Sequence, residues 1–110
     1  MIDGHAAFTF IVDTGATYTS IPESLAQNLG YDTDSPRVER KLVAGVGGRL
    51  SVPVIRVQAL NVGGYAVSNL EVIVLPDSST PNFGLLGMNF LRNFKYTVDS
   101  ARSELRLERQ

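Results

Sequence analysis

The sequence contains no cysteine and only one histidine, His5. Without cysteine the chain can form no disulfide, no cysteine-ligated zinc site and no thiolate nucleophile. With a single histidine, neither a histidine-based metal cluster nor a Cys–His catalytic pair can be assembled. We therefore predict no metal and no cofactor, and we interpret His5 as a turn or strand-edge residue.

An excess of charge of either sign is also missing, because 10 Lys and Arg residues face 11 Asp and Glu residues. A nearly neutral chain without a basic run has no general attraction for nucleic acid or for an anionic membrane. Uncharged stretches such as Val57–Leu70 are too short and too rich in glycine to span a bilayer. Residues 1–12 lack the basic start of a signal peptide. We expect no nucleic-acid partner and no membrane segment within these residues, and the sequence indicates no cellular location.

What the chain does contain is the composition of an ordinary globular protein, with 44% apolar and 19% charged residues among 110. A chain of this length can build one sizeable core but not two lobes. We therefore expect a single domain over residues 1–110. Because the first expected strand begins close to the first residue, this domain is compatible with excision from a longer chain.

The most informative stretch is Phe10-Ile11-Val12-Asp13-Thr14-Gly15-Ala16-Thr17. Ile11 and Val12 are β-formers and predict the end of a buried strand. Asp13 would lie where the strand turns, and Gly15 would supply backbone freedom or a close approach that a side chain would forbid. A carboxylate held at a rigid strand end can act as an acid–base group. The alternative is an Asx-turn, in which Asp13 only accepts backbone hydrogen bonds.

A helix and a hairpin are expected next. Ser20-Ile21-Pro22-Glu23 resembles a capping box with Ser20 as the N-cap, and Gly30 would end the short helix that follows. The double glycine in Gly45-Val46-Gly47-Gly48, between two β-rich arms, predicts a hairpin. Pro53 in the second arm suits an exposed or edge strand, because proline donates no ladder hydrogen bond.

The rest of the chain predicts further strands and one more short helix. Asn61-Val62-Gly63-Gly64 is a second hairpin turn, and Tyr65–Leu75 is the strand after it. A helical pattern runs from Met88 to Arg92. Two alternating segments, 94–98 and 103–108, then flank a turn that includes Asp99. The expected fold class is therefore all-β, with one or two short helices.

Three features now follow one another in order: Asp13-Thr14-Gly15 after an apolar strand, the glycine-tipped hairpin, and Leu85-Leu86-Gly87 ahead of a short helix. This order, together with the hexapeptide from Ile11 to Ala16, resembles the single-lobed retropepsin-like aspartic proteases over nearly the whole chain. The resemblance implies the acid-protease fold, a closed β-barrel or sandwich, in a homodimer. It also implies that the Leu-Leu-Gly segment packs behind the active-site loop.

The resemblance further implies an aspartic endopeptidase. In this class two carboxylates face one water, and because like charges about 3 Å apart do not both ionise, the pair shares a proton. The ionised carboxylate takes a proton from the water, and the protonated one polarises the scissile carbonyl. Since the chain has one such aspartate, an Asp13 from each subunit would meet on a two-fold axis. The Thr14 hydroxyl would bond across that axis, and the Gly15 N–H would support the carboxylates.

The substrate implied by the resemblance is an extended peptide, over which the glycine-tipped hairpin would close as a flap. Substrate contacts are expected from Ala16, from Gly45-Val46-Gly47-Gly48 and from Leu86. The chain departs from viral members in its lengths and in the hairpin tip, where no flap aromatic can be placed by motif. Two other interpretations stay open: a catalytically silent peptide-binding or dimerisation module of the same fold, and a small β-barrel that binds an unrelated ligand.

Overall fold

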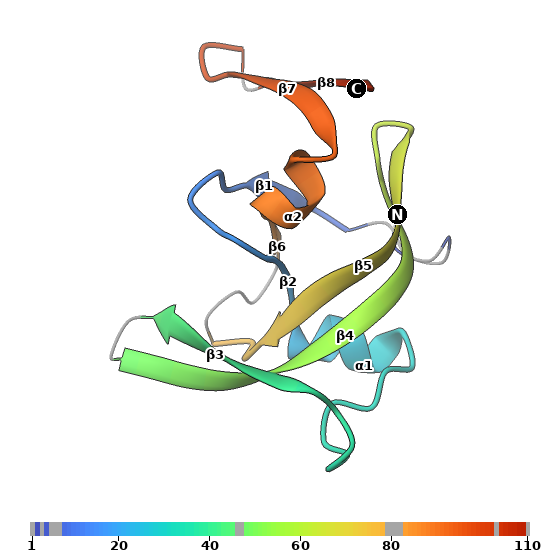
Figure 1. Cartoon of the computed structure of the whole chain (residues 1–110), viewed down its shortest axis with the longest axis vertical. Helices are drawn as coiled ribbons and strands as arrows, with labels where there is room; N and C mark the ends of the chain where they lie inside the picture. Colours follow the sequence, from blue (N-terminus) through green and yellow to red (C-terminus); the bar gives the residue numbers. More distant parts are fainter. Residues whose placement is uncertain are drawn as a thin grey trace.

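The structure is a computed structural model that describes residues 2, 4, 8–45, 48–78, 83–102 and 104–109, so that His5, Val46 and Gly47 lie outside the described residues. Figure 1 shows the elements in colours that follow the sequence. They are β1 (Phe10–Val12), β2 (Thr19–Pro22), α1 (Glu23–Asn28), β3 (Arg40–Gly45), β4 (Gly48–Val62), β5 (Tyr65–Leu75), β6 (Gly84–Leu86), α2 (Met88–Leu91), β7 (Phe94–Asp99) and β8 (Glu104–Arg109).

One curled six-stranded sheet organises the fold, with the strand order β1-β6-β2-β5-β4-β3. β1 pairs with β6, and β2 with β5, in parallel, whereas the remaining neighbours are antiparallel. β7 and β8 form a separate two-stranded sheet that stands at the top of Figure 1. The all-β class is confirmed. The edge strands β1 and β3 are not neighbours in the described sheet, so the curled sheet forms a half-barrel.

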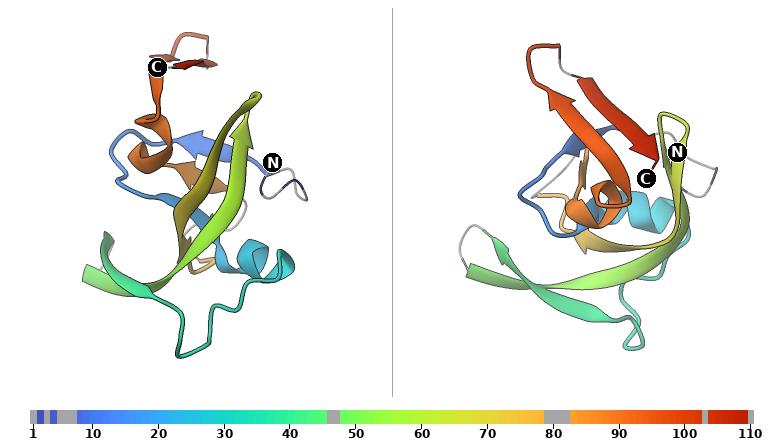
Figure 2. Two further views of the ribbon diagram at one scale, coloured as in Figure 1. Left: turned by 45° about the vertical axis from the view of Figure 1, so that its right-hand side comes forward. Right: turned by 45° about the horizontal axis from the view of Figure 1, so that its top comes forward.

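The long strand β4 changes its neighbour at Pro53. Arg40 and Pro53 form the last pair of the β3–β4 ladder, and Val54 and Ile73 form the first pair of the β4–β5 ladder. The missing N–H of proline is accommodated where the strand passes from one partner to the other. The outer part of β4 therefore pairs with β3 alone, and this hairpin extends away from the rest of the sheet (Figures 1 and 2).

The predicted hairpins are both present. In the first, Gly45 and Gly48 are paired in register at the end of the ladder. In the second, Val62 pairs with Tyr65 across Gly63 and Gly64, which have φ angles of +59° and +87°. Two successive residues with positive φ make the turn that best matches the twist of antiparallel strands. The sequence therefore located this turn through a backbone requirement that only a few residue types meet.

The predicted capping box is wrong. Ser20 lies within β2, and α1 begins at Glu23 with Pro22 as an N-cap that makes no side-chain cap hydrogen bond. Strand β2 is paired on both sides, and these ladders continue the extended backbone to Pro22 against the local helix signal. The free backbone N–H of Ser24 instead donates to Asp77 Oδ1 at 3.1 Å. A carboxylate from a distant loop thus supplies the cap that helix starts require.

The expected burial of β1 is also wrong, because Ile11 has 47% of its surface exposed. β1 is an edge strand with β6 as its one neighbour in the described sheet, so part of it has no cover from the chain itself. The main core lies elsewhere and contains Ile21, Val57, Leu60, Val72, Val74, Leu86, Phe90 and Leu91. A smaller apolar cluster is formed by Val52, Val54 and Ile73. No helix among the described residues is long and apolar enough to cross a membrane.

Phe90→Ala tests the main core. Phe90 is fully buried and its ring centroid lies 5.2 Å from that of Phe94. Truncating a buried phenylalanine removes its transfer free energy and leaves a cavity, so we expect the free energy of unfolding to fall by about 3–5 kcal/mol. The control is Leu42→Ala, where the side chain is 67% exposed and the expected loss is below about 0.5 kcal/mol. Urea denaturation at one protein concentration measures both, and equal losses would contradict this account of the core.

Candidate active site

Asp13 directly follows β1, and its loop is closed by its own hydrogen bonds. The Asp13 N–H donates to the Leu86 carbonyl at 3.0 Å, and the Ala16 N–H donates to the Asp13 carbonyl at 3.1 Å. The Gly15 N–H donates to Asp13 Oδ1 at 3.1 Å. This last bond is the Asx-turn of the alternative interpretation, and it is also the support that the family resemblance expects from Gly15. The carboxylate is half-buried and held in place by the backbone around it.

The Asp13 loop is attached from behind to the segment that joins β6 to α2. The Met88 N–H donates to the Ala16 carbonyl at 2.8 Å, and the Asn89 N–H donates to the Thr17 carbonyl at 3.0 Å. The expectation that Leu85-Leu86-Gly87 packs behind this loop is therefore confirmed. The position of the carboxylate is set by a neighbouring element and not by the loop alone.

Gly87, unlike Gly15, is a position where this chain leaves no room for a side chain, and Gly84 is another. A Cβ atom on Gly87 would lie 2.4 Å from the Tyr18 carbonyl carbon and 2.8 Å from the Thr19 nitrogen. A Cβ atom on Gly15 would meet only Asp13 Oδ1, at an ordinary 3.4 Å, and the φ of Gly15 is not in the positive region. The steric reason expected for Gly15 is thus not found within one copy of the chain.

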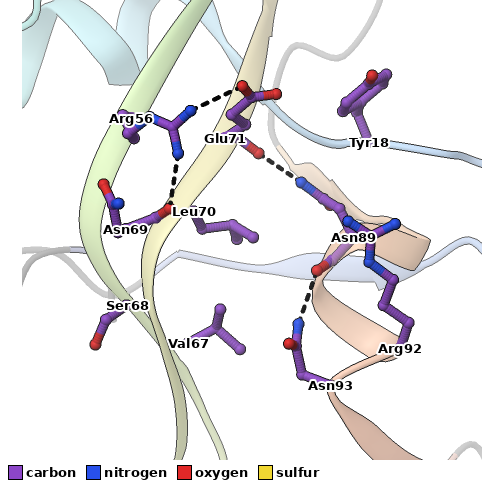
Figure 3. Close-up of a pocket in the computed structure, with 10 residues that line it drawn as sticks. All are labelled: Tyr18, Arg56, Val67, Ser68, Asn69, Leu70, Glu71, Asn89, Arg92 and Asn93. Carbon is purple, nitrogen blue, oxygen red and sulfur yellow. Dashed lines mark hydrogen bonds and ion pairs between the residues drawn. The ribbon is translucent and has the colours of Figure 1, made fainter.

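A buried hydrogen-bond network between Thr19 and Asn89 was missed by the sequence analysis. Thr19 Oγ1 donates to Asn89 Oδ1 at 2.8 Å and accepts from the Gly87 N–H at 3.1 Å, and the Thr19 N–H also donates to Asn89 Oδ1 at 2.8 Å. Asn89 Nδ2 then donates to the Glu71 carbonyl at 2.6 Å (Figure 3). The one signal in the sequence is an asparagine inside the apolar pattern of Met88–Leu91, where a polar side chain needs a buried partner.

Asp13 opens onto a hollow of about 480 Å³, which we name the Asp13 hollow. Around this space the structure brings Asp13, Gly15 and Ala16 together with β3, one of the two strands of the β3–β4 hairpin. Thr14 is exposed, and Gly48 is not among the described residues that line it. The lining residues are Asp13, Gly15, Ala16, Thr17, Tyr18, Ser20, Leu42, Val43, Ala44, Ile73, Leu75 and Leu85.

Leu86 was expected to contact substrate, and this placement is corrected by the structure. Leu86 is 1% exposed and belongs to the main core, whereas its neighbour Leu85 lines the Asp13 hollow. Successive side chains of a strand point to opposite faces of the sheet, so only one of the two leucines can face the hollow. A Leu-Leu pair in a sequence does not reveal which one does.

Tyr18 also lines a second hollow of about 390 Å³, which we name the Arg56 hollow. Its walls are polar, and Figure 3 shows the Arg56 guanidinium between Glu71 and the Asn69 carbonyl, with distances of 2.9 and 3.2 Å. Lys41 Nζ lies 5.0 Å from the centroid of the Tyr18 ring. The Tyr18 side chain, aided by Glu71 and Glu39, raises the pKa of Lys41 above its ordinary value. Lys41 is therefore positively charged and lies beside Tyr18, which lines both hollows.

The described residues contain no group of three or more His, Asp or Glu side chains that could hold a metal ion. The groups that the structure gathers beside the Asp13 hollow are one carboxylate, the backbone N–H of Gly15 and mostly apolar walls. A fixed carboxylate next to a largely apolar cavity is suited to moving a proton on a bound ligand.

This fold, with Asp13 at the end of β1 and its loop held against the β6–α2 segment, is that of the retropepsin-like aspartic protease family. The crystal structure of a retropepsin-like aspartic protease from Rickettsia conorii is similar, with a TM-score of 0.68 and 28% sequence identity over 89% of this chain and 70% of that chain. The family model described as "gag-polyprotein putative aspartyl protease" matches residues 1–93. The chain therefore belongs to the gag-polyprotein type of retropepsin-like aspartyl proteases. No curated protein matches it.

Thr19→Val tests the network behind the Asp13 loop. Valine keeps the shape of threonine but leaves the buried Gly87 N–H without its acceptor, so we expect the free energy of unfolding to fall by about 1–3 kcal/mol. Thr19→Ser is the matched variant, because it keeps the hydroxyl and loses one methyl group, at a cost of about 1 kcal/mol. Chemical denaturation compares the two. A serine variant less stable than the valine variant would show that packing, and not hydrogen bonding, dominates at this position.

Proposed function

We propose that this protein is an aspartic endopeptidase whose active site is assembled from two copies of the chain, each of which contributes Asp13. The observation that carries the proposal is the position of Asp13, a half-buried carboxylate fixed by backbone hydrogen bonds on the wall of a 480 Å³ hollow. Membership of the aspartyl protease family supports the same chemistry.

The need for a second copy follows from the number of carboxylates. Asp13 is the only carboxylate among the described residues that line the Asp13 hollow, and the proposed mechanism uses two. Thr14 and Gly15 are exposed beside Asp13, and Gly15 has no steric reason within its own chain to be a glycine. Ile11 on the open edge strand β1 is 47% exposed. These features agree with a two-fold contact at the Asp13 loop, where Thr14 would bond across the axis.

In the proposed reaction the two Asp13 carboxylates hold one water and share one proton. The Gly15 N–H donates a hydrogen bond to Asp13 Oδ1. The described residues provide no hydrogen bond to Asp13 Oδ2, so this oxygen is available to the water. The ionised carboxylate removes a proton as the water attacks the peptide carbonyl carbon, and the protonated carboxylate donates a hydrogen bond to the carbonyl oxygen. The proton then passes to the leaving nitrogen as the C–N bond breaks.

The proposed substrate is a peptide in extended conformation, bound under the β3–β4 hairpin. Leu42, Val43 and Ala44 of β3 line the Asp13 hollow, so the hairpin already forms one wall of the site. A peptide laid along this wall would be partly removed from water, which strengthens the hydrogen bonds and charges at the dyad. Contacts from Ala16 and from the tip Gly45-Val46-Gly47-Gly48 belong to this proposal.

Asp13→Asn is the direct test of the catalytic role. The amide cannot take a proton from water, so we expect cleavage of a mixed-sequence peptide library to fall by at least ~100-fold. Mass spectrometry reads the cuts at acidic and neutral pH. Asp99→Asn is the matched control, because Asp99 also ends a strand and accepts the Arg102 N–H in a turn. Equal cleavage by wild type and Asp13→Asn would leave a peptide-binding module as the better description.

Mixing subunits tests whether each active site needs two copies. Wild type is mixed with an equal amount of Asp13→Asn until the subunits exchange fully. About half of the wild-type chains then lie in mixed dimers, which contain only one Asp13 and should be inactive, so the activity should fall to about half. Adding Asp99→Asn in the same amount should cause no such loss. Unchanged activity with Asp13→Asn, in a mixture shown to exchange by native mass spectrometry, would mean that one chain is sufficient.

A further inference from the structure

The Ser20 hydroxyl is buried without a partner. Ser20 is 1% exposed, and Oγ makes no hydrogen bond to the described residues. The other buried polar side chains differ: Thr19 and Asn89 bond to each other, and Thr33 Oγ1 lies 3.4 Å from Glu23 Oε1. Buried polar groups in folded proteins are almost always satisfied, so an exception needs an explanation.

Strand alternation turns Ser20 toward the Asp13 hollow. Its neighbours in β2 face the other side of the sheet, since Thr19 joins the Asn89 network and Ile21 lies in the main core. Ser20 is in register with Leu85 of β6 and Ile73 of β5, and all three line the hollow. Residues paired across strands project to the same face. They form a row of one hydroxyl between two aliphatic side chains.

In this row, the Ser20 hydroxyl is a polar group at the most buried position of the Asp13 hollow. Among the described lining residues, Ser20 is the one that is both polar and buried. A water bound at Oγ would need two or more further polar partners, whereas the residues in register are aliphatic. A charged ligand group would lose its hydration in exchange for a single neutral hydroxyl. A neutral ligand group that both donates and accepts hydrogen bonds therefore suits this position better than a water molecule or a charged group does.

We infer that the Asp13 hollow contains a subsite, centred on the Ser20 hydroxyl, that selects a substrate side chain with a hydroxyl or carboxamide group. The inference rests on the proposed endopeptidase function and specifies its substrate. The aliphatic neighbours Leu85 and Ile73 accept the carbon atoms of such a side chain, and Ser20 satisfies its polar atom. A site built around a buried hydrogen bond discriminates strongly against an analogue that cannot form it.

Matched peptides test the subsite. From a sequence that wild type cleaves, pairs are made that differ only by Thr or Val at one position at a time. At the peptide position that occupies the subsite, wild type should prefer the Thr peptide to the Val peptide. We expect this preference, measured as the ratio of their kcat/KM values, to be at least ~tenfold higher for wild type than for Ser20→Ala. Ser20→Thr should retain the preference for Thr. Ser68→Ala, an exposed strand serine that does not line the Asp13 hollow, should keep the wild-type ratio.

The thermal midpoint supplies a readout that does not depend on cleavage. Removing a hydroxyl that has no partner should leave the Tm of Ser20→Ala equal to that of wild type or above it. A Tm lower by several degrees would show that Ser20 has an internal partner, and this would overturn the inference. Identical Thr-to-Val ratios for wild type and Ser20→Ala at every position would also overturn it while the protease proposal stands. A wild type that cleaves no peptide would overturn both.

Discussion

The hydrogen bonds that Asn89 makes from inside the protein hold the candidate active site together. Its carboxamide accepts two hydrogen bonds from Thr19 of β2 and donates one to the Glu71 carbonyl of β5. Its backbone N–H supports the Asp13 loop through the Thr17 carbonyl. One residue therefore joins two strands of the sheet to the loop that carries the carboxylate. Because this network is buried, losing any partner leaves a polar group that water does not reach.

The two faces of the sheet have different roles, and single strands serve both. In β2, Thr19 and Ile21 belong to the interior while Ser20 faces the Asp13 hollow. In β6, Leu86 packs in the core while Leu85 lines the hollow. The part of the wall formed by Ser20, Ile73 and Leu85 is consequently the outer side of well-packed strands, whereas residues 13 and 15–18 belong to the loop between β1 and β2. Side chains placed in this way keep their positions better than side chains on free loops.

The sequence predicted those features that depend on local chemistry. The Gly63-Gly64 turn requires positive φ angles, and the strand Tyr65–Leu75 is rich in β-formers. The strand was predicted with its correct bounds, whereas the turn was predicted from Asn61 although β4 continues to Val62. Features set by distant contacts were missed. Ser20 has the local pattern of a helix cap, yet pairing on both sides of β2 makes it a strand residue. The Thr19–Asn89 bond joins residues 70 positions apart, and no local pattern encodes such a pair.

The change of partner in β4 has a mechanical consequence. At Pro53 the strand leaves β3 and joins β5, so no ladder joins the outer hairpin to β5. The hairpin meets the rest of the sheet through the continuing backbone of β4, the packing of Val52 with Ile73 and the Lys41–Glu71 ion pair. Leu42, Val43 and Ala44 lie on this hairpin and line the Asp13 hollow. The width of the space beside Asp13 therefore depends on the direction in which the hairpin leaves the sheet.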